Sequence, residues 1–198
     1  MKSNLLIALF ALGVFTTSTV PASAQGVLTG DTRLACEALL CLSTGKMPSE
    51  CVPSIQRYFS ISYKSFADTL RGRINFLNLC PASNQSADMG SLVNAISNGA
   101  GRCDASSLNR TLLNHYNSVE DWTVVISNQM PGYCSAYTTH QFTDLGDTAP
   151  KYVGIPERGG YWIDAKDYAG ALAAYNARIL AEDQAAALAA MANGNGGD

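Results

Sequence analysis

The six cysteines constrain the fold of this chain more than any other feature of its 198 residues. Four of them lie within residues 31–81, and the other two are Cys103 and Cys134. An even number of cysteines in an exported chain predicts a disulfide framework, here of three bridges. A zinc site is not expected, because there is no Cys-x-x-Cys pair and the only two histidines, His115 and His140, lie outside the cysteine-rich stretch.

The first 24 residues have the layout of a signal peptide. Lys2 supplies the positive start, residues 5–15 form an apolar run, and Ala22-Ser23-Ala24 is a small-x-small cleavage pattern. The run is shorter than the roughly 20 residues of a stable membrane span, although an uncleaved anchor is the alternative. We therefore expect Sec export to an oxidising compartment, cleavage after Ala24, a single domain over residues 25–192 and a disordered tail over residues 193–198.

Helix geometry suggests how the first four cysteines pair. Cys36 and Cys41 lie on a predicted helix that starts at Asp31 or Thr32, about 140° apart around its axis, so they cannot bond to each other. The chain breaks at Pro48 and returns, which brings Cys51 back to Cys41. Cys80 falls in the last turn of a later helix and is the natural partner of Cys36.

The third bridge follows by elimination and joins Cys103 to Cys134. Six cysteines allow fifteen connectivities, so sequence alone leaves the pairing open.

Apolar periodicity predicts a mainly α fold, a small helical domain held by disulfides. Gly45 is expected to cap the first helix. Ser65-Phe66-Ala67-Asp68 resembles a capping box and opens the strongest helix, with Phe66, Leu70, Ile74 and Leu77 on one face. Further helices are predicted over residues 52–61, weakly over 89–96, after Asp104 with Leu108, Leu112 and Leu113 inside, and from Asp164 onward.

Strands are predicted only in the second half. The run 122–126 (WTVVI) is too short for periodicity to separate strand from helix. A short hairpin is expected between residues 152–155 and 161–163, turning at 157–160. The rest of residues 133–161 is expected to be irregular, with Pro131-Gly132 as a turn.

Catalytic motifs are missing from the sequence. There is no Gly-x-Ser-x-Gly, and the even cysteine count leaves no obvious free thiol. Glu37 could imitate the helical acid of a peptidoglycan-cleaving enzyme, but Ala38 follows it where such enzymes have serine. His115 and His140 are expected to be surface or packing residues. We therefore expect no catalytic residue, no metal and no cofactor.

Action through protein contacts is the remaining class of function. The net charge of −3 and the absence of a polybasic run argue against nucleic-acid or lipid partners. Arg57, Arg71 and Arg73, mixed with Asp68, are expected to form a solvated helix face. The alanine-rich end beyond Ala181 either docks on a partner or is poorly ordered. An aromatic cluster is either an interaction surface or a second small core; it comprises Tyr133, Tyr137, Phe142, Tyr152, Tyr161 and Trp162.

Three segments together carry a family resemblance: GDTRLACEALLCLSTGKMPSEC (30–51), RGRINFLNLCP (71–81), and YCSAYTTHQFTD (133–144) followed by GGYWIDAKDY (159–168). They resemble the TrbM/KikA family of conjugal transfer proteins from plasmid mating-pair-formation regions. The resemblance implies a periplasmic accessory of a type IV secretion system whose partners are other envelope proteins of that system. It brings no catalytic residues, and because some members are associated with host killing, a toxin or effector stays open beside the peptidoglycan-cleaving enzyme.

Overall fold

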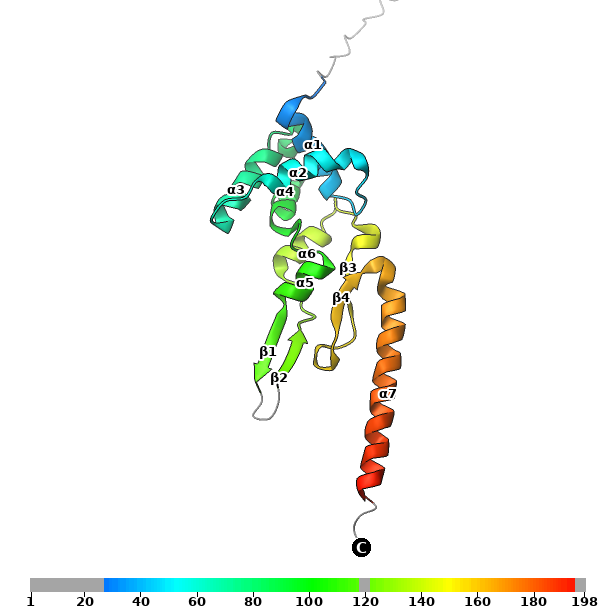
Figure 1. Ribbon diagram of the computed structural model, residues 1–198. Coiled ribbons are helices and arrows are strands. Elements are labelled where there is room, and N and C mark those ends of the chain that lie inside the picture. The colour runs from blue at the N-terminus through cyan, green and yellow to red at the C-terminus, as the bar shows by residue number, and fades with distance from the viewer. Residues whose placement is uncertain (1–26, 118–121, 195–198) are drawn as a thin grey trace, which may run out of the picture.

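The helices of the first half form one end of an elongated molecule, and two β-hairpins and a long last helix form the other (Figure 1). The computed structural model describes residues 27–117 and 122–194. The predicted signal peptide and its cleavage site lie outside this part, as do residues 195–198 of the predicted tail.

Seven α-helices and two antiparallel strand pairs make up the described ranges, so the mainly α prediction is confirmed. The helices are α1 (Gly30–Leu42), α2 (Val52–Ser60), α3 (Phe66–Leu77), α4 (Ala87–Gly99), α5 (Ala105–Thr111), α6 (Gly132–Thr138) and α7 (Tyr168–Gly194). The strands are β1 (Leu113–Asn117), β2 (Trp122–Ile126), β3 (Pro150–Val153) and β4 (Tyr161–Asp164). Short 3₁₀ turns connect them: η1 (Ser49–Cys51), η2 (Pro81–Asn84), η3 (Gly146–Thr148), η4 (Pro156–Arg158) and η5 (Ala165–Asp167).

Three disulfides join the cysteines in the predicted pairs. Cys36–Cys80 links α1 to the segment after α3, Cys41–Cys51 closes the turn from α1 to η1, and Cys103–Cys134 ties the chain after α4 to α6. The Cα–Cα distances of 4.8, 5.9 and 5.3 Å lie in the ordinary disulfide range. All six cysteines are paired. Each bridge restricts the unfolded chain and contributes about 2–4 kcal/mol.

Helix α4 lies at the centre of the helical end, although its sequence predicts only a weak helix. Ser86 caps it by accepting a hydrogen bond from the Met89 backbone N–H. Leu92, Val93 and Ile96 are buried, and α4 packs against α1, α3 and α6. The stability of α4 therefore comes from burial on several sides and not from its own propensity.

Helix α3 begins at the predicted cap, and its predicted apolar face is buried at Leu77 but not at Phe66. The Ser65 side chain accepts the Asp68 N–H. Phe66, at the start of the predicted apolar face, is exposed, while Thr69 and Phe76 are buried. Only the second half of α3 packs deeply, because there it meets α1 and α4.

The segment after α4 differs from the prediction at two points and settles a third that the sequence left open. The Asp104 side chain caps α5 as expected, but the helix ends at Thr111, and Leu113 begins β1. Antiparallel pairing of β1 with β2 resolves residues 122–126 as a strand. Pro131-Gly132 begins helix α6 where an irregular segment was expected. Short elements such as these are decided by tertiary partners that sequence periodicity does not reveal.

The second hairpin agrees with the prediction. β3 pairs with β4 in antiparallel register, and Gly159 supplies the left-handed conformation (φ 70°) that ends η4. Asn109 of α5 fixes the hairpin, because its amide donates to the Trp162 carbonyl (2.8 Å) and accepts the Trp162 N–H (2.7 Å).

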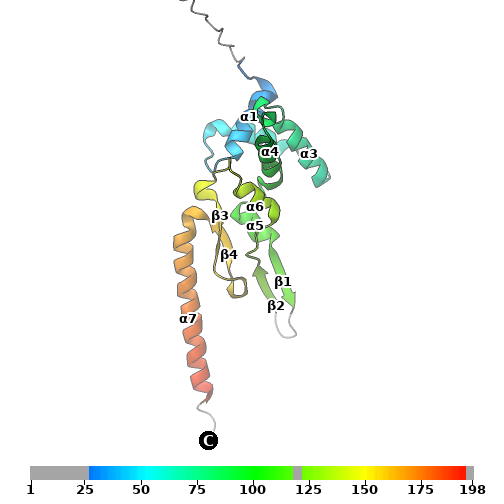
Figure 2. The same cartoon turned by 180° about the vertical axis from the view of Figure 1, so that it is seen from behind.

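Helix α7 docks by its first half and then extends away from the body (Figures 1 and 2). Tyr175 is buried and its hydroxyl accepts the Ile155 N–H (3.2 Å). Arg158 reaches from η4 to Asp183 (2.7 Å) and Glu182 (3.2 Å). Beyond these contacts Leu188 and Met191 are exposed. The described helix continues to Gly194, so this alanine-rich segment forms a projecting helix.

Gly45 is not the helix cap that its sequence position suggests. Helix α1 ends at Leu42, and the loop after it pairs with the loop before η3: Gly45 N–H donates to Asp144 O (2.9 Å), and Asp144 N–H donates to Ser43 O (2.8 Å). A Cβ at Gly45 would lie 1.7 Å from the Leu145 carbonyl oxygen. Glycine is therefore required here because two backbones approach closely.

We predict that Gly45→Ala lowers the free energy of unfolding by about 2 to 3 kcal/mol, since the backbone of one loop must move. The matched control is Gly90→Ala in α4, where an added Cβ meets nothing within 4 Å. That change should be neutral or stabilise by up to about 1 kcal/mol. Urea unfolding of both variants checks the pair, and equal effects would contradict the loop pairing.

We also predict that replacing Cys41 and Cys51 together by serine prevents the protein from accumulating in the periplasm, the compartment that the sequence resemblance leads us to expect. The bridge closes the turn between α1 and α2 across a sequence separation of 10, and its loss frees the connection between two helices that both contribute to the core. Immunoblotting of periplasmic fractions, with Gly90→Ala as control, measures the level. A normal level of the serine variant would contradict the disulfide-braced core.

Candidate interaction site

The two hairpins lie side by side and are joined at their base by two aromatic side chains (Figure 1). The Tyr152 hydroxyl donates to Ile126 O (2.6 Å), and the Trp162 indole N–H donates to Ser127 O (3.0 Å). The two rings pack edge to face with centroids 5.3 Å apart. Because the two rings pack together and their polar atoms are hydrogen-bonded, they fix one hairpin against the other.

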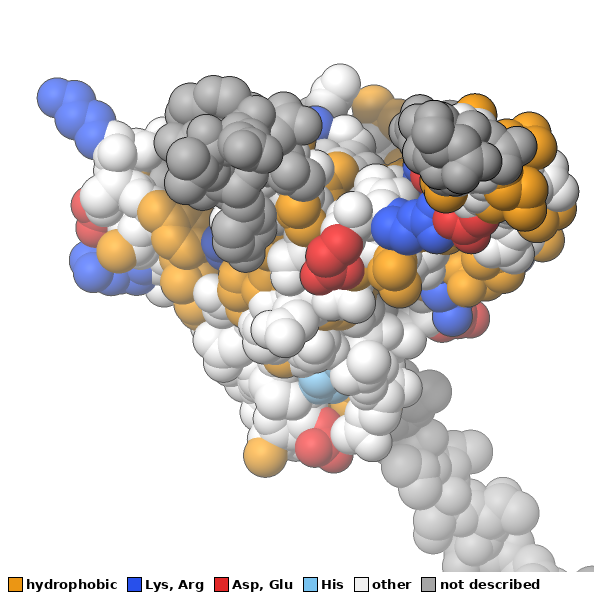
Figure 3. Space-filling view, turned by 90° about the horizontal axis from the view of Figure 1, so that it is seen from below, with side chains coloured by type: hydrophobic (Ala, Val, Ile, Leu, Met, Phe, Trp, Pro, Cys, Tyr) orange, Lys and Arg blue, Asp and Glu red, His pale blue; other side chains and the backbone are white. Residues whose placement is uncertain are grey.

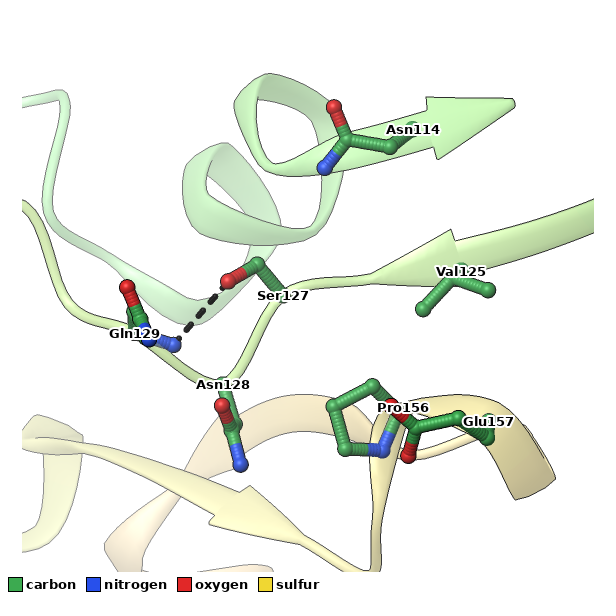
Figure 4. Close-up of a pocket in the computed structure, with 7 residues that line it drawn as sticks. All are labelled: Asn114, Val125, Ser127, Asn128, Gln129, Pro156 and Glu157. Atoms are coloured by element: carbon green, nitrogen blue, oxygen red, sulfur yellow. Dashed lines mark hydrogen bonds between the residues drawn. The ribbon is translucent and has the colours of Figure 1, made fainter. Parts of the chain in front are cut away.

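A cleft of about 650 Å³ opens between the hairpins (Figure 4). Its walls carry amide and hydroxyl groups, one carboxylate and two apolar side chains, from Asn114, Val125, Ser127, Asn128, Gln129, Pro156 and Glu157. Ser127 Oγ accepts the Gln129 N–H (3.1 Å), which orders the segment after β2. These groups can donate and accept hydrogen bonds with a polar ligand or a peptide backbone, but they include a single titratable side chain.

The predicted aromatic cluster is divided between core and surface. Tyr137 and Trp162 are buried and Tyr152 is half-buried, so these three belong to the core. Tyr133 and Tyr161 are half-buried, and Phe142 is exposed with its ring 5.7 Å from that of His140. The structure therefore does not gather the six residues into one exposed surface. Tyr137 and Trp162 belong to the same hydrophobic core as the helices, and Tyr133 and Tyr152 pack against it.

A serine–histidine contact, which the sequence does not reveal, joins α4 to the loop after α6. Ser91 Oγ lies 2.7 Å from His140 Nε2. His140 Nδ1 accepts the Phe142 N–H (3.2 Å), so in the neutral ring the proton sits on Nε2 and is donated to Ser91. Ser91 in turn donates to Asp88 O (2.9 Å). A nucleophilic serine needs the opposite direction, with the imidazole accepting its proton, so this chain of hydrogen bonds is a structural tie.

The remaining catalytic candidates are also on the surface. Glu37 pairs with Arg33 one turn earlier on α1 (2.8 Å), whereas a glycosidase acid sits in an apolar pocket. His115 is exposed on β1. Within residues 27–117 and 122–194 there is no group of three His, Cys, Asp or Glu side chains that could hold a metal ion.

Two of the three arginines of α2 and α3 do not lie on a solvated face as predicted. Only Arg71 fits it, with 73% of its side chain exposed. Arg57 pairs with Asp31 (2.7 Å) and lies 5.2 Å from the centre of the Phe76 ring. The hydrogen bond from Arg57 also holds the pKa of the Asp31 carboxyl below its usual value. Arg73 stacks on aromatic rings, as described below.

The chain was compared with family models, curated proteins and solved structures. A family model described as TrbM matches residues 27–176, which is more than half of the chain. No curated protein and no solved structure matches the chain. Among the described helices, none combines the length and the apolar character that a membrane span requires.

The buried tyrosines predict a loss of stability at high pH. Burial raises the pKa of Tyr58 and of Tyr152 to about 12, and it raises that of Tyr137 as well. In the unfolded chain tyrosine titrates near about 10, so the unfolded state releases protons first. Stability should therefore be complete below about pH 10 and fall as the pH rises from about 10 to 12.

Denaturant midpoints across this pH range check the prediction. Tyr58→Phe should reduce the fall of the midpoint with rising pH. Tyr63→Phe, which changes an exposed residue, should leave this fall unchanged. A midpoint that stays constant up to about pH 12 would contradict the burial of the phenols.

Proposed function

The chain belongs to the TrbM family of conjugal transfer-related proteins, and we propose that it is an exported periplasmic accessory of the mating machinery that acts through protein contacts. The observation that carries the proposal is the family match over residues 27–176, which spans all three disulfides. In this role the protein supports assembly or operation of a type IV secretion channel for plasmid transfer.

Export is supported by two independent features. The first 24 residues have the charge, apolar run and cleavage pattern of a signal peptide. All six cysteines form disulfides with ordinary Cα separations, and such bridges persist in oxidising compartments such as the periplasm.

Action by contact is supported by the chemistry of the side chains. Ser91 and His140 are bonded in the direction that does not activate a serine, and Glu37 is paired with Arg33 on the surface of α1. The cleft between the hairpins offers neutral amides and hydroxyls, which suit recognition of a polar segment. The projecting part of α7 adds a second exposed element that a partner could bind.

Conjugation frequency from a donor with this gene deleted in frame tests the proposal. We expect the frequency to drop and to be restored by the gene supplied in trans, because the channel would lack one of its periplasmic components. A variant with Cys41→Ser and Cys51→Ser should fail to restore it. An unchanged frequency in the deletion strain would contradict the role in transfer, and growth damage on export without other transfer genes would favour a toxin.

Catalysis is tested separately on purified protein. We expect no clearing band in a peptidoglycan zymogram. A band that disappears in Glu37→Gln would establish a peptidoglycan-cleaving enzyme, and a band that persists in this variant would indicate an enzyme with another active site.

A further inference from the structure

Two arginines on the α3 side of the molecule lie against four aromatic rings. The Arg73 guanidinium carbon is 4.9 Å from the centre of the Tyr58 ring and 5.1 Å from that of Phe59. The Arg102 guanidinium carbon is 4.4 Å from the centre of the Phe66 ring and 4.0 Å from that of Tyr133. Each cation is therefore held in place by contacts with two rings.

These residues form one continuous surface. Phe66 and Arg73 lie two turns apart on the same face of α3. The Phe59 ring packs on Gly101, where an added Cβ would lie 2.8 Å from the ring, and Gly101 precedes Arg102 in the chain. We call this the arginine–aromatic surface and define it by Phe59, Tyr63, Phe66, Arg73, Arg102 and Tyr133.

Three of its aromatic side chains are well exposed. Phe59 is 36%, Phe66 49% and Tyr63 61% accessible to solvent, and Tyr63 lies beside Gly72 of α3. Figure 3 shows basic, acidic and hydrophobic side chains next to each other on the left of the molecule, the side on which α3 lies in Figure 1. Exposed rings grouped with arginine are typical of the anchoring centre of a protein interface.

The two stacked cations have no acidic partner among the described residues. Four other arginines, Arg33, Arg57, Arg158 and Arg178, each pair closely with a carboxylate. By contrast, Arg73 donates to the Ile61 carbonyl (3.3 Å) and Arg102 to the Asn98 carbonyl (3.0 Å). A guanidinium has five N–H donors, so each keeps donors for a carboxylate, and their charge is not balanced locally in a chain of net charge −3.

We propose that the arginine–aromatic surface binds an acidic segment of a partner protein, with carboxylates on Arg73 and Arg102 and an apolar side chain between Phe59 and Phe66. The proposal rests on the proposed function in that both assume action through protein contacts. It goes further by naming the surface and the chemistry of its partner.

The same residues suit nucleic acid and lipid less well. Single-stranded nucleic acid stacks its bases on free aromatic faces, but the guanidinium of Arg102 already occupies the space over Phe66 and Tyr133. An anionic membrane is recognised by a dense cluster of Lys and Arg, whereas here Asp68 pairs with Arg71 beside the surface (3.5 Å). Bidentate bonding to carboxylates fits fixed, stacked guanidinium groups better.

Fluorescence polarisation with a synthetic probe tests the proposal on the mature, oxidised protein. The probe is a short labelled peptide of alternating glutamate and phenylalanine, and its counterpart has glutamine in place of glutamate. We expect the acidic peptide to bind about tenfold more tightly than the glutamine peptide. The difference should shrink at about 0.3 M salt, because the surface is exposed.

Variants assign the binding to the surface. Arg73→Gln with Arg102→Gln should abolish the preference for the acidic peptide. These arginines also support packing, so a second variant changes two exposed residues and leaves the core intact. It combines Tyr63→Ser with Lys64→Glu and should weaken binding of the acidic peptide. Lys151→Glu, an exposed charge change on β3, is the matched control and should bind like the unaltered protein.

Several outcomes would overturn the proposal. They are equal binding of the two peptides, no binding of either, loss of binding in Lys151→Glu to the same extent, or tighter binding of oligothymidylate or phosphatidylglycerol vesicles than of the acidic peptide. The assay is independent of mating, so a protein that binds the peptide but is dispensable for transfer keeps this surface and loses the proposed function. A protein that is needed for transfer but does not bind the acidic peptide would contradict the proposed binding surface and leave the proposed function in place.

Discussion

The packing of α6 against α4 is the contact on which the rest of the structure depends. Gly99 lacks a side chain where a Cβ would lie 2.5 Å from Tyr137, so the two helices can touch. The Tyr137 hydroxyl then reaches the Leu42 carbonyl (2.6 Å) at the end of α1, and Cys103–Cys134 locks the pair beside it. Because α6 lies between β2 and β3 in the chain, this junction joins the helical end to both hairpins. A buried phenol that satisfies a carbonyl left free at a helix end makes the junction specific as well as stable.

The structural features that the sequence predicts correctly are those determined by neighbouring residues in the chain. The angle between Cys36 and Cys41 around one helix excluded their pairing, and the return at Pro48 led to the observed Cys41–Cys51 bridge. Ser65 and Asp104 cap the helices that they precede, because capping depends on side chains within three residues of the helix start. The β3–β4 hairpin was likewise predictable from the glycines of its turn.

The missed features depend on partners that are distant in sequence. Helix α6 has only seven residues, too few for a periodic signal, and it is stabilised by α4 and a disulfide. The apolar face of α3 is buried only where the helix meets α1 and α4, so Leu77 is buried and Phe66 is left exposed. The stacking of Arg102 between Phe66 and Tyr133 joins three separate elements, and no sequence pattern identifies it. The division of the aromatic cluster between core and surface has the same origin.

We propose that this TrbM-family chain works as an exported, oxidised, disulfide-braced domain. The most direct test is intact-mass and alkylation analysis of the protein from the periplasmic fraction of donor cells. We predict a chain that begins at Gln25, with all six cysteines resistant to alkylation until reduction and with the pairs Cys36–Cys80, Cys41–Cys51 and Cys103–Cys134. A full-length chain with reactive thiols, recovered from the cytoplasm, would contradict the account.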